Sequence, residues 1–516
     1  MSSLYQQPRP GHYRLQQGVH LVSQDGSTLA ICDYPLRIVR LNPIATNLLM
    51  LCSEEYTCEQ LAQATNMPIK RIEALCDQLR WKGLLEAGPP LPPLTWPSVS
   101  IVIPSYNRAK VLERCLRSLF ALDYPANCLE IIVVDDASTD ETSSLLQRLG
   151  QEAATHDLAV QLLQHEKQQG VGISRNSGAE AAQYDLIAYI DSDCVASPNW
   201  LRELVPVFQD TRIGAVGGMI RAYDQKTLLG RYEDVRSSSY MGARSQQVSL
   251  KGPLTYLPTA NLVVRRTIWQ ELAGFAPMTQ GEDVDFCRRL LMSGAKMNYI
   301  PQGVVYHDYR TTLDTFLGIR AAYASAEAAL LKRHPAERRI LLLPPEQTIF
   351  AAAMIGGAWG VIWLLLRSIW SGFQSVAFAI AFLPLLLALL LILFGTYNRL
   401  RKVKEYGSAI RRPIVIKATL RGHLAYTYHL SRHVTRYYTL PLFVVSFGVS
   451  PVFILLLILC GIVIGVDYVR LRPEMDLGRY AICSVLDDCA YEVGVVWGCI
   501  RHRTWKPLVP VIKTRV

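Results

Sequence analysis

The sequence predicts an α/β protein made of a small winged-helix-like α+β domain, a larger domain with a mainly parallel sheet, and C-terminal transmembrane helices. Strand-like and helix-like patterns alternate over residues 98–310, which is typical of repeated β-α units. A proline-rich linker at residues 89–97 separates this region from residues 11–88. Long apolar runs occur only after about residue 348.

The composition sets the broad class of the protein. The chain has 516 residues and a formal net charge of +10, and half of its residues are hydrophobic. Its basic residues cluster near the apolar runs, which favours a membrane surface or phosphate groups as partners and not nucleic acid. Its 12 cysteines are scattered without a C-x-x-C pair. This pattern predicts reduced thiols in the cytosol. The first residues contain no apolar run of the kind found in signal peptides, so no secretory signal peptide is expected.

Residues 11–88 predict short strands followed by helices and a closing strand. Asn42-Pro43 begins one helical pattern, and residues 57–60 (TCEQ) form a capping box for the next. Pro68 suits the first turn of a third helix, and residues 81–85 (WKGLL) predict a turn and a strand. This order is typical of winged-helix modules.

Acidic residues follow the predicted strands of the larger domain. Asp135 and Asp136 come directly after the run EIIVV, and Asp191-Ser192-Asp193 follow DLIAYI. Open α/β sheets bind ligands at the carboxyl ends of their strands. A D-x-D pair there can hold a divalent cation against a diphosphate, and a later acidic pair, Glu282-Asp283, can supply a general base.

The segments VSIVIPSYNR (residues 99–108) and VVDDASTD (residues 133–140) resemble the opening of family 2 glycosyltransferases, which have the GT-A fold. The resemblance implies that Pro104 and Tyr106 border a nucleotide pocket. It also implies that Asp136, or alternatively Asp135, binds the nucleobase. The competing interpretation is that these acids cap the helix that begins near Ser138, and one acid can cap while the other binds.

Two further segments match this family. GVGISRNSG (residues 170–178) resembles G-x-x-x-A-R-N-x-G, so Arg175 is expected to contact the diphosphate or the base. In the D-x-D motif, the resemblance makes Asp193 the first ligand of a divalent metal, Mn²⁺ or Mg²⁺. Asp191 then contacts the ribose or reaches the metal through water. His307 either joins the metal or phosphate shell or is structural.

The segment GEDVDFCRR (residues 281–289) resembles the family's E-D-x-[DE]-[LF]-x-x-R motif. By this resemblance Asp283 is the catalytic base of a single inverting displacement, and Glu282 positions it or the acceptor. Asp285 and Arg288 are expected to form a simple salt pair. A further match assigns Asn261 to the acceptor pocket. The chain lacks the Q-x-x-R-W motif of processive synthases, which argues against a long polysaccharide product.

The N-terminal region resembles the PqqD-like peptide-recognition domain, which binds a precursor peptide at a strand edge. A DNA-binding winged helix is disfavoured because the predicted helix at residues 68–80 carries only Lys70, Arg71 and Arg80 as cations. The whole arrangement is similar to the glycosyltransferases of mycofactocin systems. This implies transfer of glucose from UDP-glucose to a peptide-derived redox cofactor precursor, with extension to a short oligosaccharide. One alternative is an enzyme that acts on a lipid or exopolysaccharide acceptor. The other is a binding scaffold without activity, and the intact Asp193 and Asp283 argue against it.

Three apolar segments predict membrane spans: 349–366, 376–395 and 442–466, the last interrupted by Pro451. The basic loop at residues 397–440 is expected in the cytoplasm, and this places the catalytic domain there too, in a multi-pass protein of the cell membrane. Residues 311–348 predict an interfacial helical region. Residues 467–516 are expected to form a tail, on the far side of the membrane unless the third segment is re-entrant or a further short pass lies in 489–500.

Overall fold

The structure is a computed structural model. It describes residues 8–9, 11–24, 27–33, 36–88, 91–154, 158–371, 375–404 and 412–514. Part of the predicted linker (residues 89–90) and part of the predicted basic loop (residues 405–411) lie outside these ranges.

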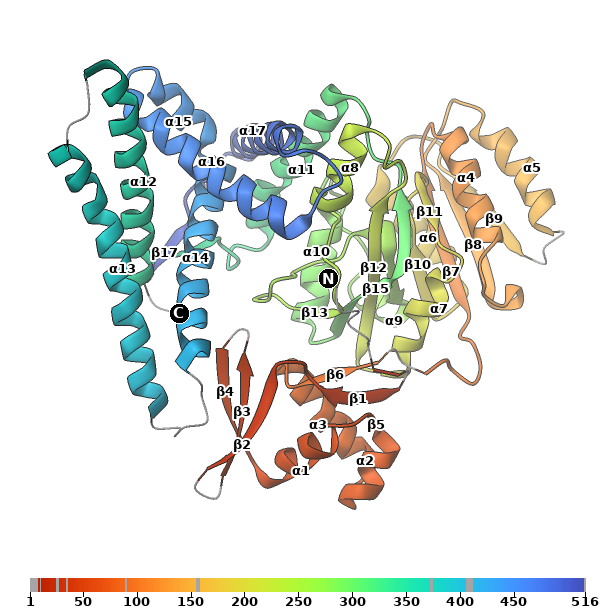
Figure 1. The fold of residues 1–516 in the computed structure, drawn as a ribbon. Coiled ribbons are helices and arrows are strands. Elements are labelled where there is room, and N and C mark those ends of the chain that lie inside the picture. The colour runs from red at the N-terminus through yellow and green to blue at the C-terminus, as the bar shows by residue number, and fades with distance from the viewer. Residues whose placement is uncertain are drawn as a thin grey trace.

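The N-terminal region contains two small sheets and three helices (Figure 1). One sheet has the order β2-β3-β4 and the other β5-β1-β6. The elements are β1 (His12–Leu15), β2 (Val19–Gln24), β3 (Ser27–Asp33), β4 (Leu36–Leu41), α1 (Pro43–Leu51), β5 (Tyr56–Thr57), α2 (Cys58–Thr65), α3 (Ile69–Trp81) and β6 (Leu85–Ala87). The predicted capping box is confirmed, since Thr57 and Gln60 exchange side-chain and backbone hydrogen bonds. Leu48, Leu61 and Ile72 are fully buried in a core that belongs to this region.

The larger domain is built on a nine-stranded mixed sheet with the order β11-β15-β12-β14-β10-β7-β8-β9, and β13 pairs with β15. Its elements are β7 (Val99–Ser105), α4 (Ala109–Phe120), β8 (Leu129–Asp135), α5 (Thr142–Ala154), β9 (Ala159–Gln164), α6 (Val171–Ala181), β10 (Leu186–Tyr189), β11 (Cys194–Ala196), α7 (Trp200–Leu204), β12 (Ile213–Ala222), α8 (Leu228–Arg236), β13 (Gln246–Val248), β14 (Leu262–Arg265), α9 (Arg266–Glu271), α10 (Glu282–Met292) and β15 (Lys296–His307).

The predicted parallel core of this sheet is confirmed. Strands β10, β7, β8 and β9 run parallel, whereas β14 lies antiparallel between β10 and β12. Every residue of β7, β8 and β10 is buried, as expected for strands that carry helices on both faces. Two separate hydrophobic cores result, which include Leu116 and Phe286 respectively. The carboxyl ends of β7, β8 and β10 therefore share one edge, where the acidic motifs begin.

The C-terminal third is mostly helical. It contains α11 (Leu313–Arg333), β16 (Ile340–Leu342), α12 (Pro345–Ser371), α13 (Ser375–Val403), α14 (Arg412–Tyr437), α15 (Thr439–Ser446), α16 (Ser450–Leu471), α17 (Leu477–Arg501) and β17 (Val511–Lys513). Within the described ranges, three stretches are long and apolar enough to cross a membrane: Pro345–Leu366, Ala381–Val403 and Ser450–Leu471. The predicted segment 442–466 is interrupted as expected, since α15 ends at Ser446 and α16 begins at Ser450, with Pro451 in its first turn.

Two predictions for this part of the chain are wrong. Much of the predicted basic loop is helical, since α13 continues to Val403 and α14 covers 412–437. The predicted tail is instead a long helix, α17, and a strand, β17, that pairs with β16. The predicted helical region at 311–348 contains α11, and α17 packs against it (Figure 1). Charged side chains of α14 and α17 pair across long separations in the sequence, as Arg432 and Arg436 do with Asp488.

Candidate active site

The acidic motifs meet at the carboxyl edge of the parallel strands, and a buried arginine joins two of them. The Arg175 side chain on α6 donates from Nη2 to Asp191 Oδ1 at 2.7 Å and from Nη1 to Glu282 Oε1 at 2.6 Å. Arg175 is almost completely buried. The sequence predicted that Arg175 contacts a diphosphate or a base. In this structure both of its terminal nitrogens bind carboxylates, so Arg175 holds the D-x-D motif against the E-D motif.

Asp283 lies in the first turn of α10, two residues after the N-cap Gly281, which has a φ of 82°. Its Oδ1 accepts a hydrogen bond from the Val284 N–H at 2.7 Å. Burial and then the neighbouring charge of Glu282 raise the pKa of Asp283 to about 7, although Arg175 acts in the opposite direction. A carboxyl group with this pKa exchanges a proton readily near neutral pH, which suits a general base.

The raised pKa of Asp283 predicts a pH dependence. Only the carboxylate form accepts a proton, so the rate should fall about tenfold for each pH unit below the pKa and level off above it. The pKa is raised from its ordinary value of 3.8 to about 7, so the folded state should lose stability as pH rises between these two values. Steady-state kcat/KM measured across this range checks the first statement. A profile that stays flat through neutral pH would contradict the assignment of the base.

Asp193 lies beside a cluster of nitrogen-bearing side chains. Arg108 binds its Oδ2, and His307 Nε2 lies 3.5 Å from its Oδ1. Strands β11 and β15 pair so that Cys194 lies opposite His307, which brings His307 to Asp193. The ligand atoms of Asp193, Cys194 and His307 all lie within 4.8 Å of one another.

The chemistry of the side chains in this cluster determines whether it suits a divalent cation. His307 Nδ1 is buried and has no hydrogen-bond partner among the described residues, so this imidazole is incompletely satisfied by them. A carboxylate and an imidazole are suitable ligands for such an ion. Burial raises the pKa of the Cys194 thiol well above its usual value, and sulfur is a softer ligand than Mn²⁺ or Mg²⁺ prefers. Asp191 is not part of this cluster, and Arg175 binds its Oδ1. Asp193 and His307 therefore have ligand atoms of a suitable kind, with Arg108 bound to the other oxygen of Asp193.

The two acids at the end of β8 have different surroundings. Asp135 Oδ1 accepts from the Ser138 N–H at 3.0 Å, but α5 begins only at Thr142, so this contact closes a turn and is not the helix cap considered from the sequence. Asp136 accepts from His165 Nδ1 at 2.7 Å and from the N–H groups of Gln169 and Gly170 at 2.9 and 2.8 Å. Gly170 has a φ of 96°, which a residue with a side chain rarely adopts. Asp136 thus anchors the segment that leads into α6 and Arg175.

The two other residues predicted for the nucleotide pocket lie at the same edge. Pro104 is buried within β7, and its register partner on β8 is Val134. Tyr106 follows the end of β7 and is exposed, so its ring is accessible to a ligand. Beyond it, Asn107 and Ser138 connect the two strand ends, because the Asn107 N–H donates to Ser138 Oγ at 2.8 Å.

Asn261 has a structural environment and not the acceptor-facing one that the sequence predicted. It is fully buried, and its Oδ1 accepts from Trp200 Nε1 at 2.8 Å. Its Nδ2 donates to the carbonyl groups of Met219 and Gly303 at 3.0 and 2.8 Å. All its polar atoms are thus occupied inside the sheet, and these contacts favour a structural role.

Replacing Asn261 with Ala tests this assignment. The Trp200 N–H and two carbonyl groups would lose their partner in a buried place, which should lower the free energy of unfolding by about 1–3 kcal/mol. The acceptor KM should stay unchanged. Urea denaturation and steady-state kinetics on the same preparation check both statements. A raised acceptor KM at unchanged stability would restore the acceptor role.

Sequence reasoning missed several residues that surround this site. Arg108 lies three residues after the end of β7, and His165 directly follows β9, so a search of the strand ends would have located both. Tyr256 and Tyr323 are harder to find. After burial, the charge of Asp283 is among the causes that raise the pKa of each phenol, which places both rings on the Asp283 side of the site. Tyr323 comes from α11, outside the sheet domain, so no strand pattern indicates it.

Comparison with known proteins adds to this geometry. Residues 100–273 match the family model described as glycosyl transferase family 2. The chain is 29% identical over 505 residues to the "Pre-mycofactocin glycosyltransferase" of Mycobacterium tuberculosis strain H37Rv, and the match covers 95% of each protein. It is 27% identical over 219 residues to "Glycosyltransferase AglE" of Haloferax volcanii, covering 42% of this chain and 68% of that protein. A solved mannosyltransferase from Pyrobaculum calidifontis, in complex with GDP-Man and Mn²⁺, matches with a TM-score of 0.40 at 19% identity, covering 66% of this chain and 88% of that one.

Proposed function

We propose that this family 2 glycosyltransferase transfers a hexose, glucose from UDP-glucose, to a peptide-derived acceptor of the pre-mycofactocin type. The similarity to the mycobacterial protein supports the acceptor, because it extends over 95% of both chains and so includes the N-terminal region. We further propose that the N-terminal region binds a peptide at a strand edge. The lack of a Q-x-x-R-W motif supports a short product over a long polymer.

The observation that carries the proposed chemistry is Asp283, an acid with a pKa of about 7 beside the D-x-D motif. In the proposed reaction, the Asp283 carboxylate takes the proton of an acceptor hydroxyl. That oxygen attacks the anomeric carbon while the bond from this carbon to the nucleoside diphosphate breaks, which inverts the configuration. Glu282, which Arg175 binds, directly precedes Asp283 in the first turn of α10. Tyr106, Asp135 and Asp136 border the proposed nucleotide pocket.

A divalent cation, Mn²⁺ or Mg²⁺, held by Asp193 and His307 would neutralise charge on the diphosphate. Arg108 and Arg310 lie on the same oxygen of Asp193 and can contribute positive charge there. We propose that Asp191 contacts the donor and reaches the cation only through water. We propose that the catalytic domain lies on the cytoplasmic face, which the basic residues Arg399, Arg401 and Lys402 near the end of α13 support.

A mass-spectrometric transfer assay tests this function. Protein in detergent is given UDP-glucose with Mn²⁺ or Mg²⁺ and either premycofactocin or a lipid extract, and a parallel sample contains a chelator. Hexose additions to premycofactocin that are lost with the chelator support the proposal. Hexose that appears only on lipid would retain the catalytic site and reject the acceptor. Transfer that is insensitive to the chelator would reject the role of the cation.

A further inference from the structure

Helix α17 has two faces of opposite character. Its inner face is buried, including Tyr480, Asp487, Asp488, Glu492 and Val495. On its outer face Ile482, Val493, Trp497 and Ile500 are 63%, 52%, 59% and 54% exposed. The spacing of these four residues places them on one stripe of the helix. An amphipathic helix therefore presents large apolar side chains outward.

The inner face is held tightly against α11. Gly494 and Gly498 lie one turn apart, opposite the backbone of Ala321 and Ser325, and a side chain at either glycine would collide with a carbonyl oxygen of α11. Such paired glycines allow two helix backbones to approach closely. Any larger residue at these positions would push α17 away from α11.

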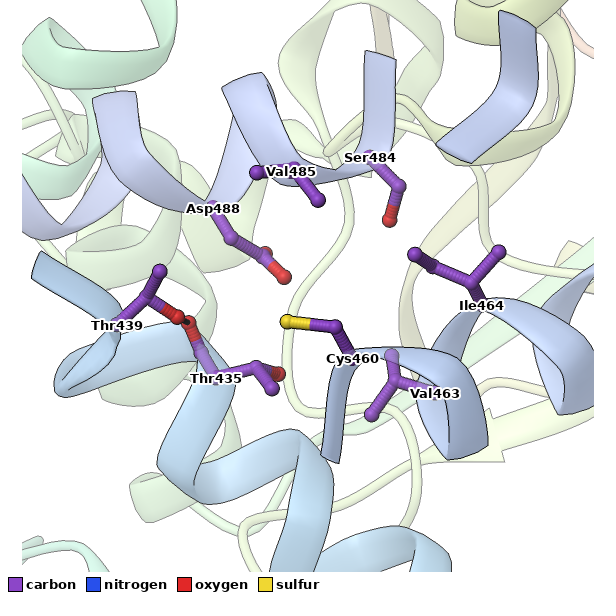
Figure 2. Close-up of a pocket in the computed structure, with 8 residues that line it drawn as sticks. All are labelled: Thr435, Thr439, Cys460, Val463, Ile464, Ser484, Val485 and Asp488. Carbon is purple, nitrogen blue, oxygen red and sulfur yellow. Dashed lines mark hydrogen bonds between the residues drawn. The ribbon is translucent and has the colours of Figure 1, made fainter. Parts of the chain in front are cut away.

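Charged groups also hold the inner face. Asp487 lies 3.4 Å from Arg320 Nε of α11 and accepts from the Tyr232 hydroxyl of α8 at 3.0 Å. Asp488 accepts from Arg432 and Arg436 of α14 at 2.5 and 2.9 Å. Figure 2 shows Asp488 pointing into a pocket that Cys460 of α16 and Ser484 also line. Because the acids are paired inside, α17 cannot turn its apolar stripe inward.

The position of the stripe indicates what covers it. Helix α17 begins at Leu477, shortly after the candidate membrane span Ser450–Leu471 ends. Exposed cations flank both ends of the helix: Arg470, Arg472 and Arg479 before or at its start, and Arg501, Arg503 and Lys506 at or after its end. Asp476 pairs with Arg479 at 3.3 Å, so the positive charge at the two ends of the helix comes from the other cations named above. A helix with an apolar stripe, a tryptophan and basic ends is suited to the surface of an anionic bilayer.

We propose that α17 lies flat on an anionic lipid bilayer, with Ile482, Val493, Trp497 and Ile500 inserted among the lipids and the flanking cations at the headgroups. This goes beyond the proposed transfer reaction and does not depend on it. It also replaces α11 with α17 as the interfacial helix. Ala321 and Ser325 of α11 face α17, whereas Tyr323 belongs to the opposite side of that helix, toward Asp283. The bilayer surface would then lie two helices away from the catalytic acids.

Photo-crosslinking of the full chain in nanodiscs of phosphatidylcholine and phosphatidylglycerol tests the proposal. A benzophenone amino acid is introduced at Val493 or Trp497, with Leu390 of α13 as a membrane control. Met292 of α10, which is 65% exposed, is the solvent control. We expect lipid adducts at the α17 positions several-fold above those at Met292. Adducts at the Met292 level, or adducts to a second copy of the chain, would overturn the proposal.

A second measurement separates docking from nonspecific labelling. With the benzophenone at Ile482, the double substitution V493E/W497E should lower the lipid adduct several-fold, because two carboxylates disfavour insertion of the stripe. These residues are exposed, so the fold should be retained, and M292E is the matched control. Equal labelling at Ile482 in the double variant and in M292E would overturn the proposal.

Discussion

Replacing Asp283 with Asn is expected to abolish hexose transfer while leaving folding and donor binding intact. The amide has nearly the same shape but cannot accept the proton of the acceptor hydroxyl, so the rate should fall at least about 100-fold. The pKa of Asp283 is raised to about 7 by burial and by Glu282, so its ionised form is costly in the folded protein. Asn removes this cost, and the melting temperature above neutral pH should be unchanged or higher. Transfer assays, binding of the nucleotide sugar and thermal unfolding at several pH values check these statements.

Asp285 provides the matched control for this substitution. It lies on the same helix and is fully buried, and its oxygens bind Arg289, Arg333 and His334 at 2.8, 2.7 and 2.9 Å. Burial opposes ionisation of Asp285, but these partners prevail and hold its pKa below the ordinary value. Asp285→Asn should therefore destabilise the protein, unlike Asp283→Asn. Transfer that survives in Asp283→Asn would reject Asp283 as the base.

Replacing Arg175 with Ala should both destabilise the protein and shift its pH profile. Asp191 and Glu282 would lose a buried partner, and breaking a buried ion pair in this way costs about 3–5 kcal/mol. Arg175 also lowers the pKa of Asp283, so its removal should move the rise in activity to higher pH. Chemical denaturation measures the first effect, and kcat/KM against pH measures the second. Arg175→Lys keeps the charge and should reduce both effects.

Arg117 is the matched control for Arg175. It also joins two acids, Glu113 at 2.9 Å and Glu152 at 2.7 Å, but it lies at the surface of α4. Water screens such exposed pairs, so Arg117→Ala should change neither stability nor the pH profile appreciably. Equal losses of stability in the Arg117 and Arg175 variants would contradict the role of burial. An unshifted profile in a folded Arg175 variant would separate Arg175 from the base.

Much of the fold could be predicted because its signals are local. The continuous apolar runs of β7, β8 and β10 indicated buried parallel strands, and the acids at their ends indicated the edge where a site would form. The capping box at Thr57 was readable because both partners lie within one helical turn. The long apolar stretches of α12, α13 and α16 were readable from composition alone. Predictions failed where polar residues looked exposed, as in the supposed tail that forms α17.

The sequence by itself determined the strands and helices at the centre of the sheet domain, the positions of the acidic motifs and the membrane-compatible helices, because each depends on neighbouring residues. Only the tertiary structure decided which groups these acids meet. Arg175 joins Asp191, 16 residues away, to Glu282, 107 residues away. Arg108 reaches Asp193 across 85 positions, and Asn261 joins Trp200 across 61. Ion pairs and buried hydrogen bonds depend on distance in space, and sheet order and helix crossing set that distance independently of separation along the chain.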